Sequence, residues 1–171
     1  MILTGIGSQQ TPLDIQEAMV KIASFLASKG FMLRSGGANG ADSAFEKGFR
    51  LAKAQDRMEI YLPWPRFNDN PSPLYGVCDE AIRIAAGIHP AWPRCGRGVR
   101  LLHGRNAYQI LGKTLDKPSD IVICWTKNAQ MIGGTRTALI LAKQYDIPIF
   151  NLADSRVLKH IMRELDNDDK P

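Results

Sequence analysis

The segment of this sequence best suited to chemistry is a glycine-rich turn, Leu33-Arg34-Ser35-Gly36-Gly37-Ala38-Asn39-Gly40-Ala41-Asp42, between an apolar run and an amphipathic run. Glycines there can adopt positive φ without a Cβ clash, so successive backbone N–H groups at a helix start can converge on a phosphate. A second pair, Gly133-Gly134, follows the apolar run 121–125 and precedes another helical pattern. Two such turns predict a nucleotide-sized ligand; the alternative is that the glycines only make tight turns.

Several polar side chains near these turns could contact such a ligand. Asp42 could accept a hydrogen bond from a ribose hydroxyl, or simply stabilise the start of its helix. Arg105 could pair with phosphate through two parallel hydrogen bonds, and Asn106 could bind a base or a ribose. Ser8 and Thr135 lie beside glycines, where a hydroxyl can donate to phosphate or cap a helix.

Two glutamates are candidates for catalysis, if the protein breaks an N-glycosidic bond. Such chemistry needs an acid near the bond that breaks, and Glu46 and Glu80 are the carboxylates we would assign to it. Glu46 follows Asp42 by four residues on the same helical face. The alternative for Glu46 is a surface acid close to Lys47 and Arg50.

The positive charge of the chain suggests a different class of partner. The net charge is +5 and the pI about 9.2. The segment from Arg66 to Arg105 carries +3 of this charge, because it holds three acids, no lysine and six arginines: 66, 83, 94, 97, 100 and 105. Trp64 and Trp92 lie in proline-bearing loops, where their rings could stack on bases. The arginine-rich segment and these tryptophans could therefore bind single-stranded DNA. The alternative is a solvated surface.

Composition and cysteine content limit the class of protein. The chain has 171 residues, of which 44% are hydrophobic and 23% charged, so we expect one domain over residues 1–165 and a frayed polar tail over 166–171. The three cysteines, Cys78, Cys95 and Cys124, form no disulfide or zinc pattern, and the histidines show no ligand spacing, so we expect no metal site and a reducing cytoplasm. No apolar run is long enough to span a bilayer. A first strand beginning at Ile2 would leave no room for a signal peptide.

Apolar runs and helical patterns alternate along the chain. We expect strands at 1–5, 31–35, 59–62, 121–125 and 147–150, and helices at 12–28, 41–54, 76–86, 99–115, 135–145 and 154–165. Thr11 is predicted to cap the first helix, with Pro12 at its first position and Asp14 as the capping-box acid. This order predicts an α/β fold, a Rossmann-like three-layer sandwich with a five-stranded parallel sheet. Ligands bind such sheets at the carboxyl ends of the strands, where the strand order reverses.

A nicotinamide-dinucleotide site is not favoured. Gly5-Ile6-Gly7-Ser8-Gln9-Gln10 begins like the GxGxxG fingerprint, but Gln10 replaces the third glycine. The second strand ends in Arg34-Ser35 and not in the acid that would hold a ribose hydroxyl. We therefore expect no cofactor.

Three motifs together resemble the SLOG superfamily, which includes DNA-processing protein A, the LOG-type phosphoribohydrolases and small sensor domains. They are the string from Ser35 to Asp42, Arg105-Asn106 at a helix start, and Gly133-Gly134-Thr135 followed by Ala138 and Ala142. The resemblance runs from Leu3 to about Leu152 and implies a ligand over the Gly36 and Gly133 loops. The predicted ligand-binding residues are Gly5, Ser8, Ser35, Gly36, Gly37, Ala38, Asn39, Gly40, Asp42, Arg105, Asn106, Gly133, Gly134 and Thr135.

The sequence departs from the better-known branches of this superfamily. LOG-type enzymes carry a PGGxGTxxE motif, where this chain has Ile132 for the proline, Arg136 for the third glycine and Ile140 for the glutamate. The DNA-processing branch usually has extra domains. The chain is most similar to the small stand-alone members, for which binding of a nucleotide-derived small molecule by a homo-oligomer is the expectation. An N-glycosidic hydrolase of nucleoside monophosphates and a single-stranded DNA binder are the alternatives.

Overall fold

The computed structural model describes residues 1–168 and contains the predicted five-stranded parallel sheet. Its strands are β1 (Ile2–Gly7), β2 (Met32–Ser35), β3 (Met58–Ile60), β4 (Ile121–Trp125) and β5 (Ile149–Asn151). They lie in the order β3-β2-β1-β4-β5, and every pairing is parallel. The α/β, Rossmann-like fold class is therefore confirmed.

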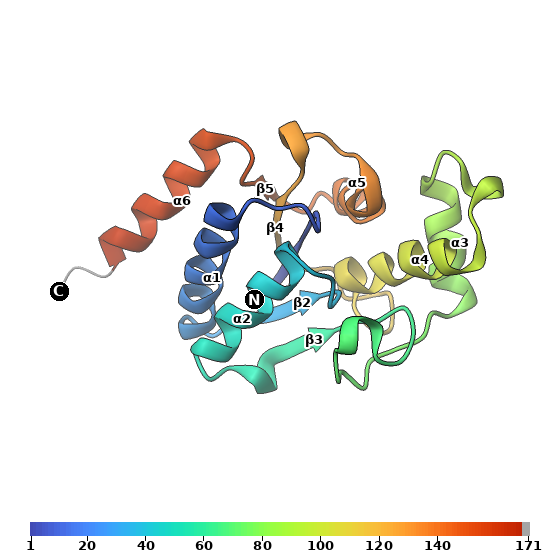
Figure 1. Cartoon of the computed structure of the whole chain (residues 1–171), viewed down its shortest axis with the longest axis horizontal. Coiled ribbons are helices and arrows are strands. Elements are labelled where there is room, and N and C mark those ends of the chain that lie inside the picture. Colours follow the sequence, from blue (N-terminus) through green and yellow to red (C-terminus); the bar gives the residue numbers. More distant parts are fainter. Residues whose placement is uncertain (169–171) are drawn as a thin grey trace.

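Six helices cover the two faces of this sheet (Figure 1). On one face lie α1 (Leu13–Ser28), α2 (Ala41–Leu51) and α6 (Ser155–Asp168), which bury a cluster around Met19, Leu33 and Phe45. On the other lie α3 (Asp79–Ile88), α4 (Arg97–Leu111) and α5 (Arg136–Gln144), which bury a cluster around Ile110 and Leu139. Burial on both faces explains why the strands are apolar runs and not alternating patterns.

The order of the strands reverses between β1 and β4. From β1 the chain builds β2 and β3 on one side, and then crosses to place β4 and β5 on the other. The carboxyl ends of β1 and β4 stay in register, with Gly5 beside Ile123 and Gly7 beside Trp125. Because α1 leaves β1 toward one face and α5 leaves β4 toward the other, a crevice opens between their loops.

The start of α1 differs from the prediction. The helix begins at Leu13, and Pro12 before it is extended (φ −55°, ψ 149°), so no side chain caps the helix. Thr11 donates instead from Oγ1 to the carbonyl oxygen of Ser8, at 2.7 Å. A proline locked in that conformation places Thr11 too far back to reach the first turn, and its hydroxyl ties down the loop after β1.

Other helices and strands begin or end a few residues from their predicted bounds. The chain leaves β3 after Ile60, because Leu62 donates its N–H to Leu74. Helix α4 spans 97–111 and not 99–115, since Gly112 turns the backbone at φ 74°. Helix α6 continues to Asp168, past the predicted end of the domain at 165, and the rest of the predicted tail lies outside the described residues. Within residues 1–168, no helix combines the length and apolar character needed to cross a bilayer.

The crossing of α1 and α2 gives a test of the packing. A Cβ on Gly48 would lie 2.5 Å from both the Ala23 Cβ and the Val20 carbonyl oxygen, whereas a Cβ on Gly87 in α3 would meet nothing within 4 Å. We expect Gly48→Ala to lower the free energy of unfolding by about 1–3 kcal/mol. The control Gly87→Ala, which removes a helical glycine, should leave it unchanged or raise it by up to about 1 kcal/mol. Urea unfolding of both variants measures this, and equal effects would contradict the packing described.

Candidate ligand-binding pocket

A cavity of about 570 Å³ lies in the crevice between the β1 and β4 loops. This volume is in the range of small-molecule sites. The loop after β1, the loop after β4, the α2 start, the inner face of α4 and Phe67 provide its walls. The lining residues are Ile6, Gly7, Ser8, Gln9, Gln10, Ala38, Asp42, Phe67, Val99, Leu102, His103, Arg105, Asn106, Gln109, Thr126, Lys127, Ile132, Gly133, Gly134 and Thr135.

The most buried charges in this cavity form an ion pair. Arg105 Nη1 lies 3.7 Å from Asp42 Oδ2, and the side chains are only 7% and 3% exposed. Burial raises the pKa of Asp42 to about 6, against the opposing effect of the Arg105 charge. Burial also lowers the pKa of Arg105, which Asp42 opposes. The separation exceeds a hydrogen bond, so the two charges attract each other without a direct hydrogen bond. Asp42 Oδ2 accepts instead from the Ala38 N–H at 3.3 Å.

Two hydrogen-bond donors beside this pair have no partner among the described residues. They are Arg105 Nε and Gln109 Nε2, on residues that are 6% and 2% exposed. Both residues line the cavity. A buried donor without an acceptor costs about 1–3 kcal/mol, so such atoms usually indicate a ligand or water. We call Asp42, Arg105 and Gln109 the buried polar cluster.

The glycines of the first glycine-rich turn pack against the cluster and do not line the cavity. A Cβ on Gly36 would lie 1.6 Å from Arg105 Nη1 and 2.5 Å from Gln109 Nε2. Gly37 and Gly40 adopt φ of 66° and 80°, and a Cβ would meet Leu62 in the first case and the Ser8 carbonyl in the second. Gly36 thus allows α4 to approach the turn closely, Gly37 allows Leu62, and Gly40 allows the β1 loop. None of the three lines the cavity, and their predicted role as a phosphate cradle stays a prediction.

The second glycine pair is open to a ligand. Gly133 and Gly134 are exposed and line the cavity, and a Cβ on either would meet nothing within 4 Å. Gly133 has φ 65°, and a short helical turn, Gly133–Thr135, leads directly into α5. Asn106 donates from Nδ2 to the Gly134 carbonyl at 2.7 Å and ties this turn to α4. We call Gly133, Gly134 and Thr135 the glycine rim.

His103 and Phe67 add an uncharged wall to the cavity. His103 Nδ1 lies 2.8 Å from Thr137 Oγ1, and burial lowers the His103 pKa to about 4, so the ring is neutral at neutral pH. The Phe67 ring centroid lies 6.0 Å from the Arg105 guanidinium carbon. Neither residue was predicted from sequence, nor was Gln109. Gln109 lies four residues after Arg105 on the same helical face, and this spacing is the sequence signal that could have indicated Gln109.

The structure brings together eight of the fourteen predicted ligand-binding residues. Those that line the cavity are Ser8, Ala38, Asp42, Arg105, Asn106, Gly133, Gly134 and Thr135, whereas Gly5, Ser35, Gly36, Gly37, Asn39 and Gly40 do not. Ser35 donates from Oγ to the Gly5 carbonyl at 2.7 Å, which joins β2 to β1. Asn39 is exposed. Ser8 Oγ accepts from the Gln10 N–H at 3.0 Å and stabilises its own loop.

The two predicted catalytic glutamates lie outside the cavity lining. Glu46 is 5% exposed and not the surface acid considered above, because Asn70 from the loop after β3 covers it and donates to it at 3.1 Å. Arg50 pairs with the same carboxylate oxygen, with a distance of 2.9 Å between Arg50 Nη2 and Glu46 Oε2. Glu80 is exposed in the first turn of α3.

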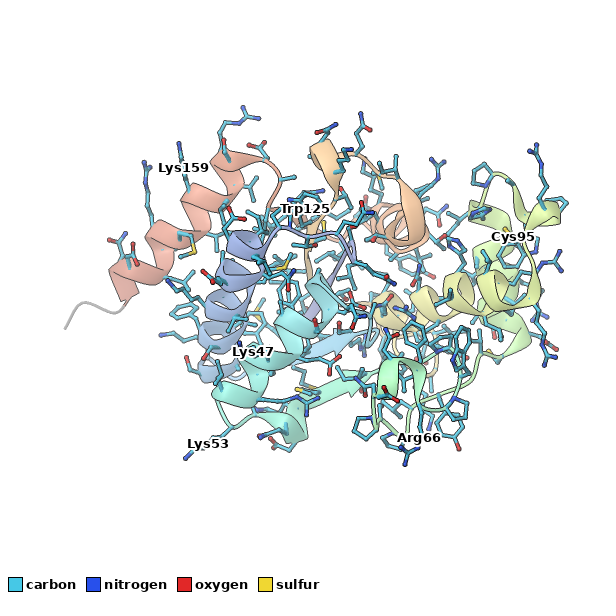
Figure 2. The ribbon with its side chains drawn as sticks, in the orientation of Figure 1. Lys47, Lys53, Arg66, Cys95, Trp125 and Lys159 are labelled. Carbon is cyan, nitrogen blue, oxygen red and sulfur yellow. The ribbon has the colours of Figure 1, made fainter. Side chains whose placement is uncertain are left out.

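The arginine-rich segment does not gather at one place. Arg105 is buried in the cavity, Arg83, Arg94 and Arg97 are exposed on or beside α3 and α4, and Arg66 lies in the loop after β3 (Figure 2). Trp64 packs edge-on against Phe67, with centroids 5.2 Å apart. Among the described residues, no group of three or more His, Cys, Asp or Glu side chains could hold a metal ion.

No protein-family model and no curated protein sequence matches this chain. Solved structures with a similar fold include the following two. One is DNA processing protein A from Helicobacter pylori, whose description concerns its single-stranded DNA binding mode; the TM-score is 0.51 and the identity 16%, over 88% of this chain and 64% of that chain. The other is the Moco carrier protein of Chlamydomonas rheinhardtii, with a TM-score of 0.50 and 17% identity over 88% of this chain and 74% of that chain.

These likenesses concern the fold alone. DNA processing protein A is one of the groups that the sequence motifs resemble, so the resemblance extends to the architecture. The chain spans less than two thirds of the length of that protein. The chemistry of the pocket therefore depends on its own residues.

The raised pKa of Asp42 predicts how stability depends on pH. An Asp that binds its proton more tightly when folded favours the folded state at low pH, and this contribution is lost as the pH rises through about 6. We expect the free energy of unfolding of the wild type, relative to Asp42→Asn, to fall between about pH 5 and about pH 7.5. Urea unfolding across that range measures the difference.

Asp154→Asn is the control for this experiment. Hydrogen bonds from Arg156 lower the pKa of the half-buried Asp154 to about 2, so it is ionised in both the folded and the unfolded protein over the same range. Its effect on stability should therefore not change with pH. If the difference in free energy of unfolding between the wild type and Asp42→Asn also did not change with pH, Asp42 would not be the titrating group.

Proposed function

We propose that the pocket binds a phosphorylated, nucleotide-derived small molecule. The observation that carries this proposal is a pair of buried donors, Arg105 Nε and Gln109 Nε2, that find no partner in the described part of the chain and belong to residues that line the cavity. A ligand with several hydrogen-bond acceptors would satisfy both atoms. The neighbouring Arg105 charge favours a ligand that is negatively charged overall.

The glycine rim is the place for the phosphate. Gly133 and Gly134 present backbone without side chains to the cavity, at the start of the nine-residue helix α5. Backbone N–H groups and the helix dipole favour an anion at such a position. Ser8 and Lys127, which also line the cavity, would lie on the phosphate side. A phosphate on the rim stays away from the carboxylate of Asp42, which would repel it.

We propose binding and not hydrolysis. The predicted acids Glu46 and Glu80 lie outside the cavity lining, and Glu46 is occupied by Arg50 and Asn70. The glutamate of the LOG motif is replaced by Ile140. A sensor or sequestering protein, formed by the single domain predicted over 1–165, is the function that these residues support.

The test is a thermal-melt panel followed by calorimetry, with the four ribonucleoside 5′-monophosphates and ADP-ribose as probes. A ligand at about 100 times its Kd adds about 2.7 kcal/mol, or a shift of about 5–10 °C for a domain of this size. We expect at least one probe to shift the melting temperature. Gly134→Val should lower its affinity by at least about tenfold, because the side chain fills the phosphate site.

Gly134 suits this test because its substitution leaves the packing intact. Gly87→Val is the matched control, since a Cβ there also meets nothing within 4 Å but Gly87 lies in α3, outside the cavity lining. Gly37→Val would not serve, because Gly37 has positive φ and packs on Leu62. Unchanged affinity in a folded Gly134→Val variant would exclude the rim as the phosphate site, and no shift with any probe would overturn the proposal.

Single-stranded DNA binding is the second candidate. It is supported by the exposed arginines on and beside α3 and α4 and by the likeness to DNA processing protein A. Arg100 also lies over the Trp92 ring in this region, 5.5 Å from its centroid. The surface offers both charge for phosphates and an aromatic ring for bases.

This second candidate predicts a steep dependence on salt. The logarithm of the affinity for a short oligonucleotide should fall with the logarithm of salt concentration, with a slope of about −0.7 per phosphate contacted. The double variant Arg94→Glu, Arg97→Glu should reduce both the affinity and the slope, while Gly134→Val should change neither. Fluorescence anisotropy at several salt concentrations measures this. A slope near zero would remove DNA from consideration.

A further inference from the structure

The buried polar cluster combines one acceptor with two kinds of donor. Asp42 accepts, and Arg105 and Gln109 donate, each carrying one buried donor, Nε and Nε2, that has no partner within residues 1–168. We propose that the cluster binds the vicinal hydroxyls of a ribose, so that the pocket selects ribonucleotides over deoxyribonucleotides. This inference rests on the proposed nucleotide-binding function and names the class of ligand for the same pocket.

The gap between Asp42 and Arg105 is of a size that a hydroxyl can bridge. The 3.7 Å between Arg105 Nη1 and Asp42 Oδ2 is too long for a direct hydrogen bond. A hydroxyl oxygen at about 2.8 Å from each atom can accept from the guanidinium and donate to the carboxylate. Because a hydroxyl both donates and accepts, it satisfies the two charged groups at once.

Other ligand groups fit this position less well. A phosphate or carboxylate would satisfy Arg105 but would place a second negative charge beside Asp42, in a region that is almost fully buried. An apolar group would leave the two donors of Arg105 and Gln109 unsatisfied. An ammonium group would pair with Asp42 but oppose Arg105. A neutral hydroxyl is the group that avoids all three conflicts.

The Gln109 side-chain amide can donate a hydrogen bond to the second hydroxyl of the ribose. A Cβ on Gly36 would touch both Arg105 Nη1 and Gln109 Nε2, at 1.6 and 2.5 Å, so these donors lie close together over the same glycine. Vicinal hydroxyls on a furanose ring are similarly close. One hydroxyl can therefore bridge Asp42 and Arg105 while its neighbour accepts from Gln109.

The position of the glycine rim agrees with this arrangement. Asn106 follows Arg105 on α4 and bonds to Gly134, so a single helix connects the buried polar cluster to the rim. A nucleoside 5′-phosphate carries its phosphate on the same sugar that carries the hydroxyls. Hydroxyls on the cluster and phosphate on the rim thus use both ends of one ribose phosphate.

The experiment compares each ribonucleoside 5′-monophosphate with its 2′-deoxy and 3′-deoxy forms by calorimetry on the wild-type chain. Ribose 5-phosphate and 2-deoxyribose 5-phosphate are included, so that the result does not depend on the base. For every ribonucleotide that binds, we expect each deoxy form to bind at least about tenfold more weakly, because removal of a hydroxyl leaves buried groups unpaired.

Gln109→Met is the variant that separates recognition from folding. Methionine has nearly the shape of glutamine and removes the unpartnered amide, so the ligand-free protein should be at least as stable as the wild type. Its preference for the ribonucleotide over one of the two deoxy forms should nevertheless fall by at least about fivefold. Asp42→Asn, which removes the charge but keeps the shape, should reduce the preference over the other form.

The outcomes distinguish the inference from the proposed function. Equal binding of the ribo and deoxy forms to the wild type would overturn ribose recognition and leave nucleotide binding standing. An unchanged preference in Gln109→Met would also overturn the role of the cluster. Absence of binding by every nucleotide and by ribose 5-phosphate would overturn the proposed function itself.

Discussion

The close approach of Arg105 to Gly36 is the contact on which the pocket depends. It places a guanidinium from α4 over the end of β2, where a Cβ on residue 36 would be only 1.6 Å from Nη1. Among the described residues, the only acidic side chain within salt-bridge distance of the Arg105 guanidinium is Asp42, at the start of α2. Elements from both faces of the sheet therefore meet at one buried position, and the strand-order reversal between β1 and β4 leaves space beside it.

The cavity differs along its length, with a buried polar end and an exposed glycine end. The buried polar cluster is nearly closed to water, so an unpaired hydrogen-bonding atom there is costly. The glycine rim is exposed and has room around its backbone. A ligand that carries neutral polar groups at one end and a phosphate at the other matches both. The neutral His103 and the aromatic Phe67 complete the wall between α4 and the loop after β3.

The sequence predicted the elements better than it predicted the contacts. Hydrophobic patterns gave the strand 121–125 with its observed bounds and the α/β order, because both faces of a parallel sheet need apolar side chains. The function of Gly36 could not be predicted in the same way. Its partner Arg105 is 69 residues away in the chain, and only the fold brings them together. Glu46 is buried for a similar reason, since the distant Asn70 covers it.

The proposed ligand would contact the buried polar cluster and the glycine rim at the same time. The most direct measurement is a ¹H–¹⁵N correlation spectrum of the labelled protein, titrated with ribonucleoside 5′-monophosphates. Simultaneous binding to both sites predicts shifts of the Arg105 Nε–H and Gln109 side-chain amide signals, together with the backbone signals of Gly133 and Gly134. Shifts confined to the exposed arginines of α3 and α4, or no shifts at these four residues, would contradict it.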